Sequence, residues 1–249
     1  MFIRLVLLQF LFLSALFASP INIAVAANLA YVLPKLKAEF LKSYPSSQLH
    51  ITIGGSGKLA IQIERGAGYD LFLSANTEYV TRLYREGKTL KKPKVYAQGA
   101  LVLLSRKKRD FSKGMKILTP SDIKKVALAN PKTAPYGKAS VEALKKSGIY
   151  EIVEPKIVYA ESVSQTLVYT LRATDMGFVA KSALFAPNMK RFQKGTNWID
   201  VPDKLYTPIS QAAALLLHAK GNEEAEAFYD FLFGHKAKEI FQAYGYKVP

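Results

Sequence analysis

Cysteine is absent from this chain of 249 residues. Without a thiol the protein forms no disulfide, offers no thiolate to a metal ion and has no cysteine nucleophile. The sequence also lacks the cysteine that an acylated lipoprotein anchor needs, so we expect no such anchor. Histidine is scarce as well, with three residues far apart at His50, His218 and His235. Because no group of acidic residues has ligand spacing either, we expect no metal ion held directly by side chains, and no cofactor.

Acidic residues are few, with 19 Asp and Glu against 35 Lys and Arg, which gives a formal net charge of +16. The basic residues are densest between Arg106 and Lys125. We interpret this stretch as a solvated face. The alternatives are that it steers anions or docks on an acidic partner. It lacks interleaved stacking aromatic residues, so we do not expect nucleic-acid binding.

A long apolar run occurs only near the start of the chain, from Leu5 to Phe17, after Arg4. The run is too short to span a membrane, and a small residue, Ala18, follows it. The pattern predicts a secretory signal over residues 1–18, cleaved near Ala18, with a retained anchor as the alternative. We expect the mature protein in the periplasm without a stable membrane anchor.

Alternating strand and helix patterns cover the rest of the chain. The expected strands span residues 21–26, 49–53, 70–74, 99–105, 126–129, 156–160, 177–180 and 212–217. Helical periodicity follows most of them, including residues 29–40, 77–86 and 223–244. This order predicts an α/β fold with mainly parallel sheets. A second lobe would be joined through short crossings, for which Val95–Gly99 and Tyr206–Gln211 are the candidates.

Ser56 lies in a glycine-rich junction, Gly54–Lys58, between an expected strand and helix. A P-loop is excluded, because Thr52 occupies the position of the first glycine of that motif, and Leu59 follows the lysine where the motif has serine or threonine. A nucleophile elbow would need a glycine at position 58, where this chain has Lys58. An exported serine hydrolase that uses Ser56 nevertheless stays an alternative. A glycine-rich cap without a ligand is another. We favour an oxyanion site that uses the Ser56 hydroxyl and N–H, because helix N-termini attract anions. Whether Lys58 adds potential or faces solvent stays open.

Three further strand ends offer donors. Asn28 is a candidate N-cap, and its amide is alternatively a ligand donor. Ser162 and Gln165 fit a capping box that leaves the Val163 N–H near the helix start. A proline opens the helix at residues 135–146 and leaves the Tyr136 N–H free. Ligands of such sheets gather at the carboxyl ends of the strands, so these groups are candidates for one site.

Five stretches, in this order and at these intervals, resemble the molybdate-binding proteins of bacterial molybdate ABC importers, a periplasmic solute-binding family. They are residues 25–29, 55–60, 69–75, 130–137 and 240–246. The resemblance covers about residues 21–248. It implies two α/β lobes joined by two crossing strands, with lobe 1 formed by residues 19–98 and 210–249 and lobe 2 by residues 99–209.

The resemblance also implies an anion bound in the interlobe cleft by neutral donors only. The ligand positions fall on Asn28, Ser56, Tyr136 and Val163. Asn28 replaces a serine, and the expected tyrosine hydroxyl falls on Ala180, which donates nothing. The Asn28 amide is a candidate substitute for that donor.

The predicted function is capture of molybdate, and of tungstate, followed by delivery to an inner-membrane ABC permease and its ATPase. We expect a monomer and no enzymatic chemistry. A site made of donors suits a dianion and disfavours a protonated oxyanion, whose hydroxyl would find no acceptor. Binding of another oxyanion, such as sulfate or phosphate, is the alternative.

Overall fold

The computed structural model describes residues 20–249. The expected signal sequence and its cleavage site near Ala18 lie outside the described residues. Within residues 20–249, every helix is too short or too polar to cross a membrane.

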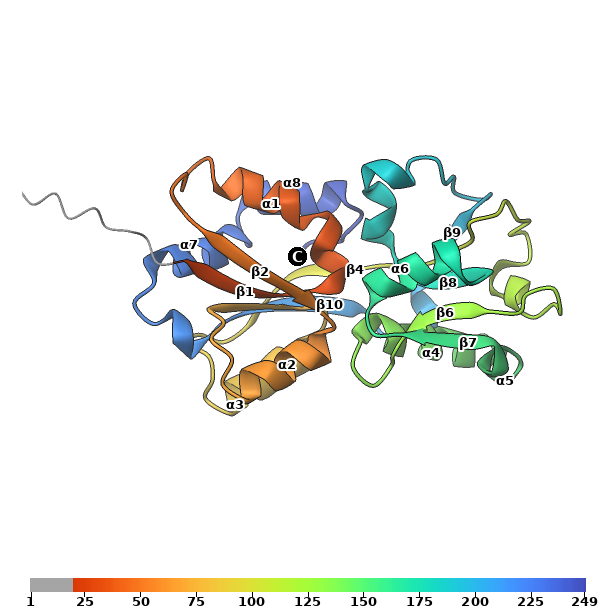
Figure 1. Cartoon of the computed structure of the whole chain (residues 1–249), viewed down its shortest axis with the longest axis horizontal. Helices are drawn as coiled ribbons and strands as arrows, with labels where there is room; N and C mark the ends of the chain where they lie inside the picture. The colour runs from red at the N-terminus through yellow and green to blue at the C-terminus, as the bar shows by residue number, and fades with distance from the viewer. Residues whose placement is uncertain (1–19) are drawn as a thin grey trace, which may run out of the picture.

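Two sheets of five strands lie side by side, each flanked by helices (Figure 1). The first sheet has the order β2-β1-β3-β10-β4, with β1 (Ile21–Ala26), β2 (Leu49–Gly54), β3 (Leu71–Ser74), β4 (Lys94–Gly99) and β10 (Ile209–Leu215). The second has the order β7-β6-β8-β5-β9, with β5 (Leu101–Leu104), β6 (Val126–Ala129), β7 (Ile157–Ala160), β8 (Met176–Ala180) and β9 (Trp198–Asp200). The predicted α/β class with two lobes is confirmed. Within each sheet, two pairings are parallel and two are antiparallel.

Helices cover both faces of each sheet. The α-helices are α1 (Leu33–Phe40), α2 (Ser56–Glu64), α3 (Thr77–Arg85), α4 (Pro135–Lys146), α5 (Tyr150–Val153), α6 (Val163–Arg172), α7 (Glu223–Phe231) and α8 (His235–Ala243). Short 3-10 helices cover Ala27–Tyr31, Gly114–Leu118, Glu154–Lys156, Lys181–Phe185, Pro187–Met189, Asp203–Leu205 and Leu217–Ala219. On the first sheet, α1, α7 and α8 pack on one face, and α2 and α3 pack on the other. Alternation along β1 explains this, because Ile23 and Val25 face the first group and Ala24 faces the second.

The chain passes between the sheets through two neighbouring crossings. β4 runs into β5 through the single residue Ala100, and the chain returns ahead of β10, where Ile209 pairs with Gly99. The apolar run at residues 99–105, expected as one strand, is therefore divided between the two sheets. Both crossings lie next to the surface where the lobes meet, so they place the strand ends of one lobe opposite those of the other (Figure 1).

Proline determines how the first helical segment is divided. The sequence predicts a helix over residues 29–40 that either tightens around Val32 or kinks because of Pro34, and in the structure a 3-10 helix ends at Tyr31 and α1 begins at Leu33. Pro34 lies in the first turn of α1, where its missing N–H has no helical acceptor to lose. The division turns the segment after β1 away from the sheet and leaves Asn28 in the 3-10 turn.

Candidate functional site

The ends of two pairs of parallel strands define the site. Ala26 of β1 lies beside Gly54 of β2, and Ala129 of β6 lies beside Ala160 of β7. Helical turns follow these strands, and α2, α4 and α6 begin close to the meeting point of the lobes. Since helix N-termini carry free N–H groups and partial positive charge, this arrangement favours an anion.

One small cavity connects these strand and helix ends. Its lining residues are Ala26, Ala27, Asn28, Gly55, Ser56, Ala75, Ala134, Pro135, Tyr136 and Val163. The cavity measures about 10 Å³, about the least that holds one water molecule, so a larger guest requires the lining residues of the two lobes to move apart. All four residues expected from the sequence therefore border the same space, whereas Ala180 is not part of the lining. The lining contains no carboxylate or ammonium group.

Backbone donors come from the first turns of three helices. Ser56 is the first residue of α2, Val163 the first of α6 and Tyr136 the second of α4. At these positions the N–H groups have no acceptor within their own helices. Two helices belong to the second lobe and one to the first, so a guest in the cavity would contact both lobes.

Local sequence fixes these helix starts. The Ser162 hydroxyl accepts from the Gln165 N–H at 3.3 Å, as the capping-box pattern predicts. The Gln165 side chain accepts from the N–H of Glu161 at 2.6 Å rather than from that of the N-cap residue. Pro135 occupies the first position of α4, where its fixed φ fits the helix.

The hydroxyl of Ser56 is oriented by the loop after β3. Its Oγ accepts from the Ala75 N–H at 3.0 Å, and the residue is 1% exposed. A hydroxyl that accepts through one lone pair still has its own proton to give. That proton is available to a guest in the cavity.

Asn28 is held by partners from distant parts of the chain. It lies inside the 3-10 turn, whose N-cap is Ala26, so the interpretation of Asn28 as an N-cap is wrong. Its Nδ2 donates to Gln211 Oε1 at 2.8 Å and to Tyr246 Oη at 3.0 Å. Its Oδ1 is buried and has no hydrogen-bond partner within residues 20–249. The Asn28 carbonyl accepts from the hydroxyls of Ser182 and Tyr246.

Buried tyrosines surround the Gln211 side chain. Gln211 Nε2 donates to Tyr136 Oη at 3.2 Å, and Tyr96 Oη donates to Gln211 Oε1 at 3.0 Å. Burial raises the pKa of Tyr136 well above its ordinary value, with further contributions from Tyr246 and Tyr96. Burial likewise raises the pKa of Tyr96 and Tyr246. These hydroxyls are therefore neutral at physiological pH and can donate as well as accept.

Gln211, Tyr96 and Tyr246 were not predicted from the sequence as site residues. The sequence contains one indication for Gln211, because this large polar residue lies beside the apolar run of β10. Because a fully buried amide needs hydrogen-bond partners, a glutamine in an apolar strand indicates a polar network around it.

Besides the hydrogen bond between Gln211 and Tyr136, three further contacts join the lobes around the cavity. Gly57 N–H donates to the carbonyl of Thr133 at 2.9 Å. Ser182 Oγ donates to the carbonyl of Asn28 at 2.9 Å. Lys58 and Glu161 form an ion pair at 2.5 Å, and their side chains are 58% and 60% exposed. Lys58 therefore links the two lobes at the surface, where an ion pair contributes about 0–1 kcal/mol.

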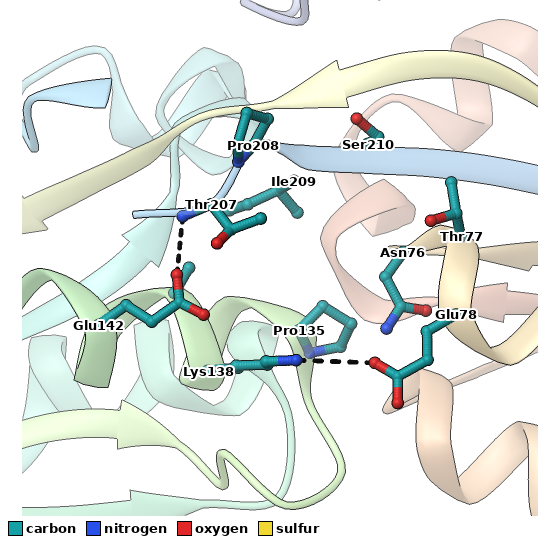
Figure 2. A pocket seen from close by; sticks show the side chains of 11 residues that line it. Asn76, Thr77, Glu78, Pro135, Lys138, Glu142, Thr207, Pro208, Ile209 and Ser210 are labelled. Carbon is teal, nitrogen blue, oxygen red and sulfur yellow. Dashed lines mark hydrogen bonds and ion pairs between the residues drawn. The ribbon is translucent and has the colours of Figure 1, made fainter. Parts of the chain in front are cut away.

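A larger cavity of about 140 Å³ lies between α3, α4 and the approach to β10 (Figure 2). Glu142 points to the Thr207 N–H, whose hydrogen bond it accepts at 2.7 Å, and Lys138 reaches Glu78 at 3.7 Å. Pro135 borders both cavities. Carboxylates in the lining repel an anion, so this second space does not suit an oxyanion.

Comparison with known proteins agrees with this geometry. The family model of the bacterial extracellular solute-binding proteins matches residues 21–247. The chain belongs to this family. This solute-binding protein is 35% identical over 231 residues to the molybdate-binding protein ModA of Azotobacter vinelandii, covering 92% of this chain and 90% of that one. It is 37% identical over 234 residues to ModA of Rhodobacter capsulatus, covering 92% and 88%.

The solved structure of the Azotobacter vinelandii periplasmic molybdate-binding protein superposes with a TM-score of 0.84 at 31% identity. The match covers 92% of this chain and 99% of that chain. The family resemblance inferred from the sequence is therefore confirmed. Because the relatives are solute-binding proteins and not enzymes, a hydrolase using Ser56 is not supported.

Proposed function

We propose that this protein captures molybdate in the small cavity between its lobes and delivers it to an ABC permease. The observation that carries the proposal is the convergence of Asn28, Ser56, Tyr136 and Val163, from both lobes, on one cavity without a charged lining group. The curated relatives that bind molybdate support the choice of anion. Tungstate resembles molybdate in charge and shape, and we propose that it binds too.

The chemistry of the donors favours a fully deprotonated oxyanion. The N–H groups of the three helix starts and the Ser56 hydroxyl proton all need acceptors, which a dianion supplies through its oxygens. Monohydrogen phosphate carries a hydroxyl that needs an acceptor in the site. Sulfate carries the same charge as molybdate, so cavity size has to discriminate between them.

Binding at the junction couples capture to lobe closure. We propose that lobe 1 comprises residues 19–98 and 210–249 and that lobe 2 comprises residues 99–209. Each lobe supplies part of the donor set, so the anion interacts best when the lobes are together. A permease can then distinguish the loaded protein from the empty one by its shape.

The cellular setting is part of the proposal. Export by the signal over residues 1–18 would place the protein in the periplasm, as a monomer, where it meets the inner-membrane permease and its ATPase. The basic stretch at residues 106–125 is a candidate contact for acidic groups of that permease.

Thermal unfolding of the mature protein with molybdate, tungstate, sulfate and phosphate tests the choice of ligand. An anion present at a thousand times its dissociation constant stabilises the folded state by about 4 kcal/mol. We expect molybdate and tungstate to raise the unfolding midpoint and the other two anions to leave it unchanged. A shift with sulfate or phosphate alone would refute the molybdate assignment.

Ser56→Ala tests the site itself. Loss of a hydrogen bond to a charged group costs about 1.5–3 kcal/mol, so the molybdate affinity should fall roughly 10- to 150-fold in calorimetric titration. Ser105→Ala is the matched control, because Ser105 is also buried but bonds the Asp175 carbonyl in the second lobe. Equal affinities for Ser56→Ala and the unmodified protein would remove Ser56 from the site.

A further inference from the structure

We propose that Gln211 is a positioning residue of the anion site, whose turned side-chain amide makes Asn28 present its Nδ2 donors to the oxyanion. In this arrangement Gln211 Nε2 faces Asn28 Oδ1, and the Asn28 amino group faces the cavity. The inference rests on the proposed function, since it concerns the donors of the same site. It follows from three unmet hydrogen-bonding requirements in one buried network.

The first requirement concerns Asn28. Its Nδ2 is engaged by Gln211 and Tyr246, neither of which borders the cavity, although Asn28 itself does. The proposal places the other end of the planar amide, occupied here by Oδ1, on the cavity side, and this oxygen is buried without a partner among residues 20–249. An oxygen acceptor facing a dianion is repulsive, whereas an amino group there donates.

The second and third requirements concern the hydroxyl protons of two tyrosines, Tyr96 and Tyr136. Tyr96 has one proton but two acceptors, the Ser74 carbonyl at 3.2 Å and Gln211 Oε1 at 3.0 Å. Tyr136 Oη accepts from Gln211 Nε2, yet no acceptor for its own proton is found within the described part of the chain. A buried donor left without an acceptor costs about 1–3 kcal/mol.

Turning both amides by half a turn meets all three requirements. The oxygen and amino group of an amide exchange places with nearly the same shape, so the heavy atoms stay where they are. Gln211 Nε2 then donates to Tyr96 Oη and Asn28 Oδ1, while Tyr136 donates to Gln211 Oε1. The Tyr96 proton is left for the Ser74 carbonyl, and Asn28 Nδ2 faces the guest. Tyr246 Oη, which lies 3.0 Å from the position that Asn28 Oδ1 then takes, gives its proton to this oxygen, and Ser182 still donates to the Asn28 carbonyl.

The surroundings force the two amides to turn together. Asn28 and Gln211 are each 0% exposed, so water does not replace a missing partner. If Asn28 alone turned, its Oδ1 would oppose Gln211 Oε1 across the 2.8 Å contact, and two acceptors would meet. A Cβ at Gly99 would collide with the Tyr136 hydroxyl and the Gln211 amide. Glycine at the lobe crossing thus leaves room for the network.

A double-mutant cycle on molybdate affinity tests the role of Gln211. Gln211→Met keeps the approximate size and removes both polar groups, and we expect it to weaken binding about tenfold in the unmodified background. If Gln211 acts through Asn28, the same substitution should change affinity less than twofold in an Asn28→Ala background. An equal loss in both backgrounds, as a general packing defect would give, overturns the proposal.

A second measurement needs no substitution at all. In the molybdate complex, NMR contacts of the Gln211 side-chain amide protons should reach the Tyr96 ring and not the Tyr136 ring. Contacts to Tyr136 alone would overturn the proposed orientation. This measurement tests the proposal even if the Gln211→Met variant does not fold. Failure of the unmodified protein to bind molybdate would instead refute the proposed function. Normal binding with an additive cycle would refute only the role of Gln211.

Discussion

Gly57 lies in the first turn of α2, where the first lobe contacts the second. A Cβ added there would lie 2.9 Å from the Thr133 carbonyl oxygen and 3.0 Å from the Thr133 Cα. Ordinary contacts of this kind are about 3.4 Å, so Gly57→Ala forces the lobes apart by about half an ångström. The Cβ would also lie 2.7 Å from Tyr79 Oη, the end of a side chain in the same lobe that can move.

The expected loss of affinity follows from that displacement. The hydrogen bond from Gly57 to Thr133 contributes about 0.5–1.5 kcal/mol, and stretching it forfeits much of that. Donors from the two lobes no longer reach the anion together, which weakens at least one charge-assisted bond. We expect an overall loss of about 1.4–2.8 kcal/mol, or 10- to 100-fold in the dissociation constant for molybdate.

Stability should change much less than affinity. Alanine is favoured over glycine in a helix by up to about 1 kcal/mol, which offsets most of the weakened Gly57–Thr133 hydrogen bond, so the anion-free variant should unfold at nearly the same urea concentration. Calorimetric titration measures the affinity, and small-angle scattering with and without molybdate measures closure. Gly54→Ala is the control, since its Cβ would contact only the flexible Leu59 side chain, at 3.3 Å, within the same lobe. Unchanged affinity and closure in Gly57→Ala would refute the argument.

Two other predictions concern the interlobe surface and the buried tyrosines. The ion pair between Lys58 and Glu161 is exposed, so it should contribute little to molybdate binding. A double-mutant cycle on molybdate affinity should give a coupling energy of about 0.2–1 kcal/mol, which vanishes in high salt. A coupling energy above about 2 kcal/mol would contradict this expectation. Because burial raises the pKa of Tyr136, its contribution to stability is complete below the unfolded-state pKa of about 10 and is lost as the pH rises toward the folded-state pKa. Between pH 9 and 11, urea unfolding should therefore show a decline in stability that Tyr136→Phe reduces by about 1.4 kcal/mol in total, and an unchanged decline would argue against neutral burial.

The backbone part of the site could be predicted because it follows local rules. A serine three residues ahead of a glutamine, a proline at a helix start and a glycine before Ser56 each determine one helix N-terminus. Parallel strands then bring such N-termini to the same edge, as the pairing of Ala26 with Gly54 shows. Each step uses residues that are near in sequence, so periodicity and capping patterns suffice.

Other features depend on partners that local patterns do not reveal. A crossing was expected at Val95–Gly99, whereas the chain leaves the first sheet at Ala100, because strand pairing and not hydrophobicity determines where β4 ends. β9 contains three half-buried residues, too few for a periodic signal. Asn28 was an N-cap candidate because of its position after a strand, yet its amide partners lie 183 and 218 residues away.

The hydroxyl expected at Ala180 shows why those distant partners matter for binding. Ser182 is the nearest hydroxyl in sequence, but it donates to the Asn28 carbonyl and not to the cavity. A serine and a tyrosine would offer a guest two protons, and an asparagine amino group also carries two. If Gln211 turns the Asn28 amino group toward the anion, both protons become available from one side chain. The number of protons offered to the anion is then unchanged, although the residues at positions 28 and 180 differ from the family pattern. Gln211, which makes this possible, lies outside the cavity.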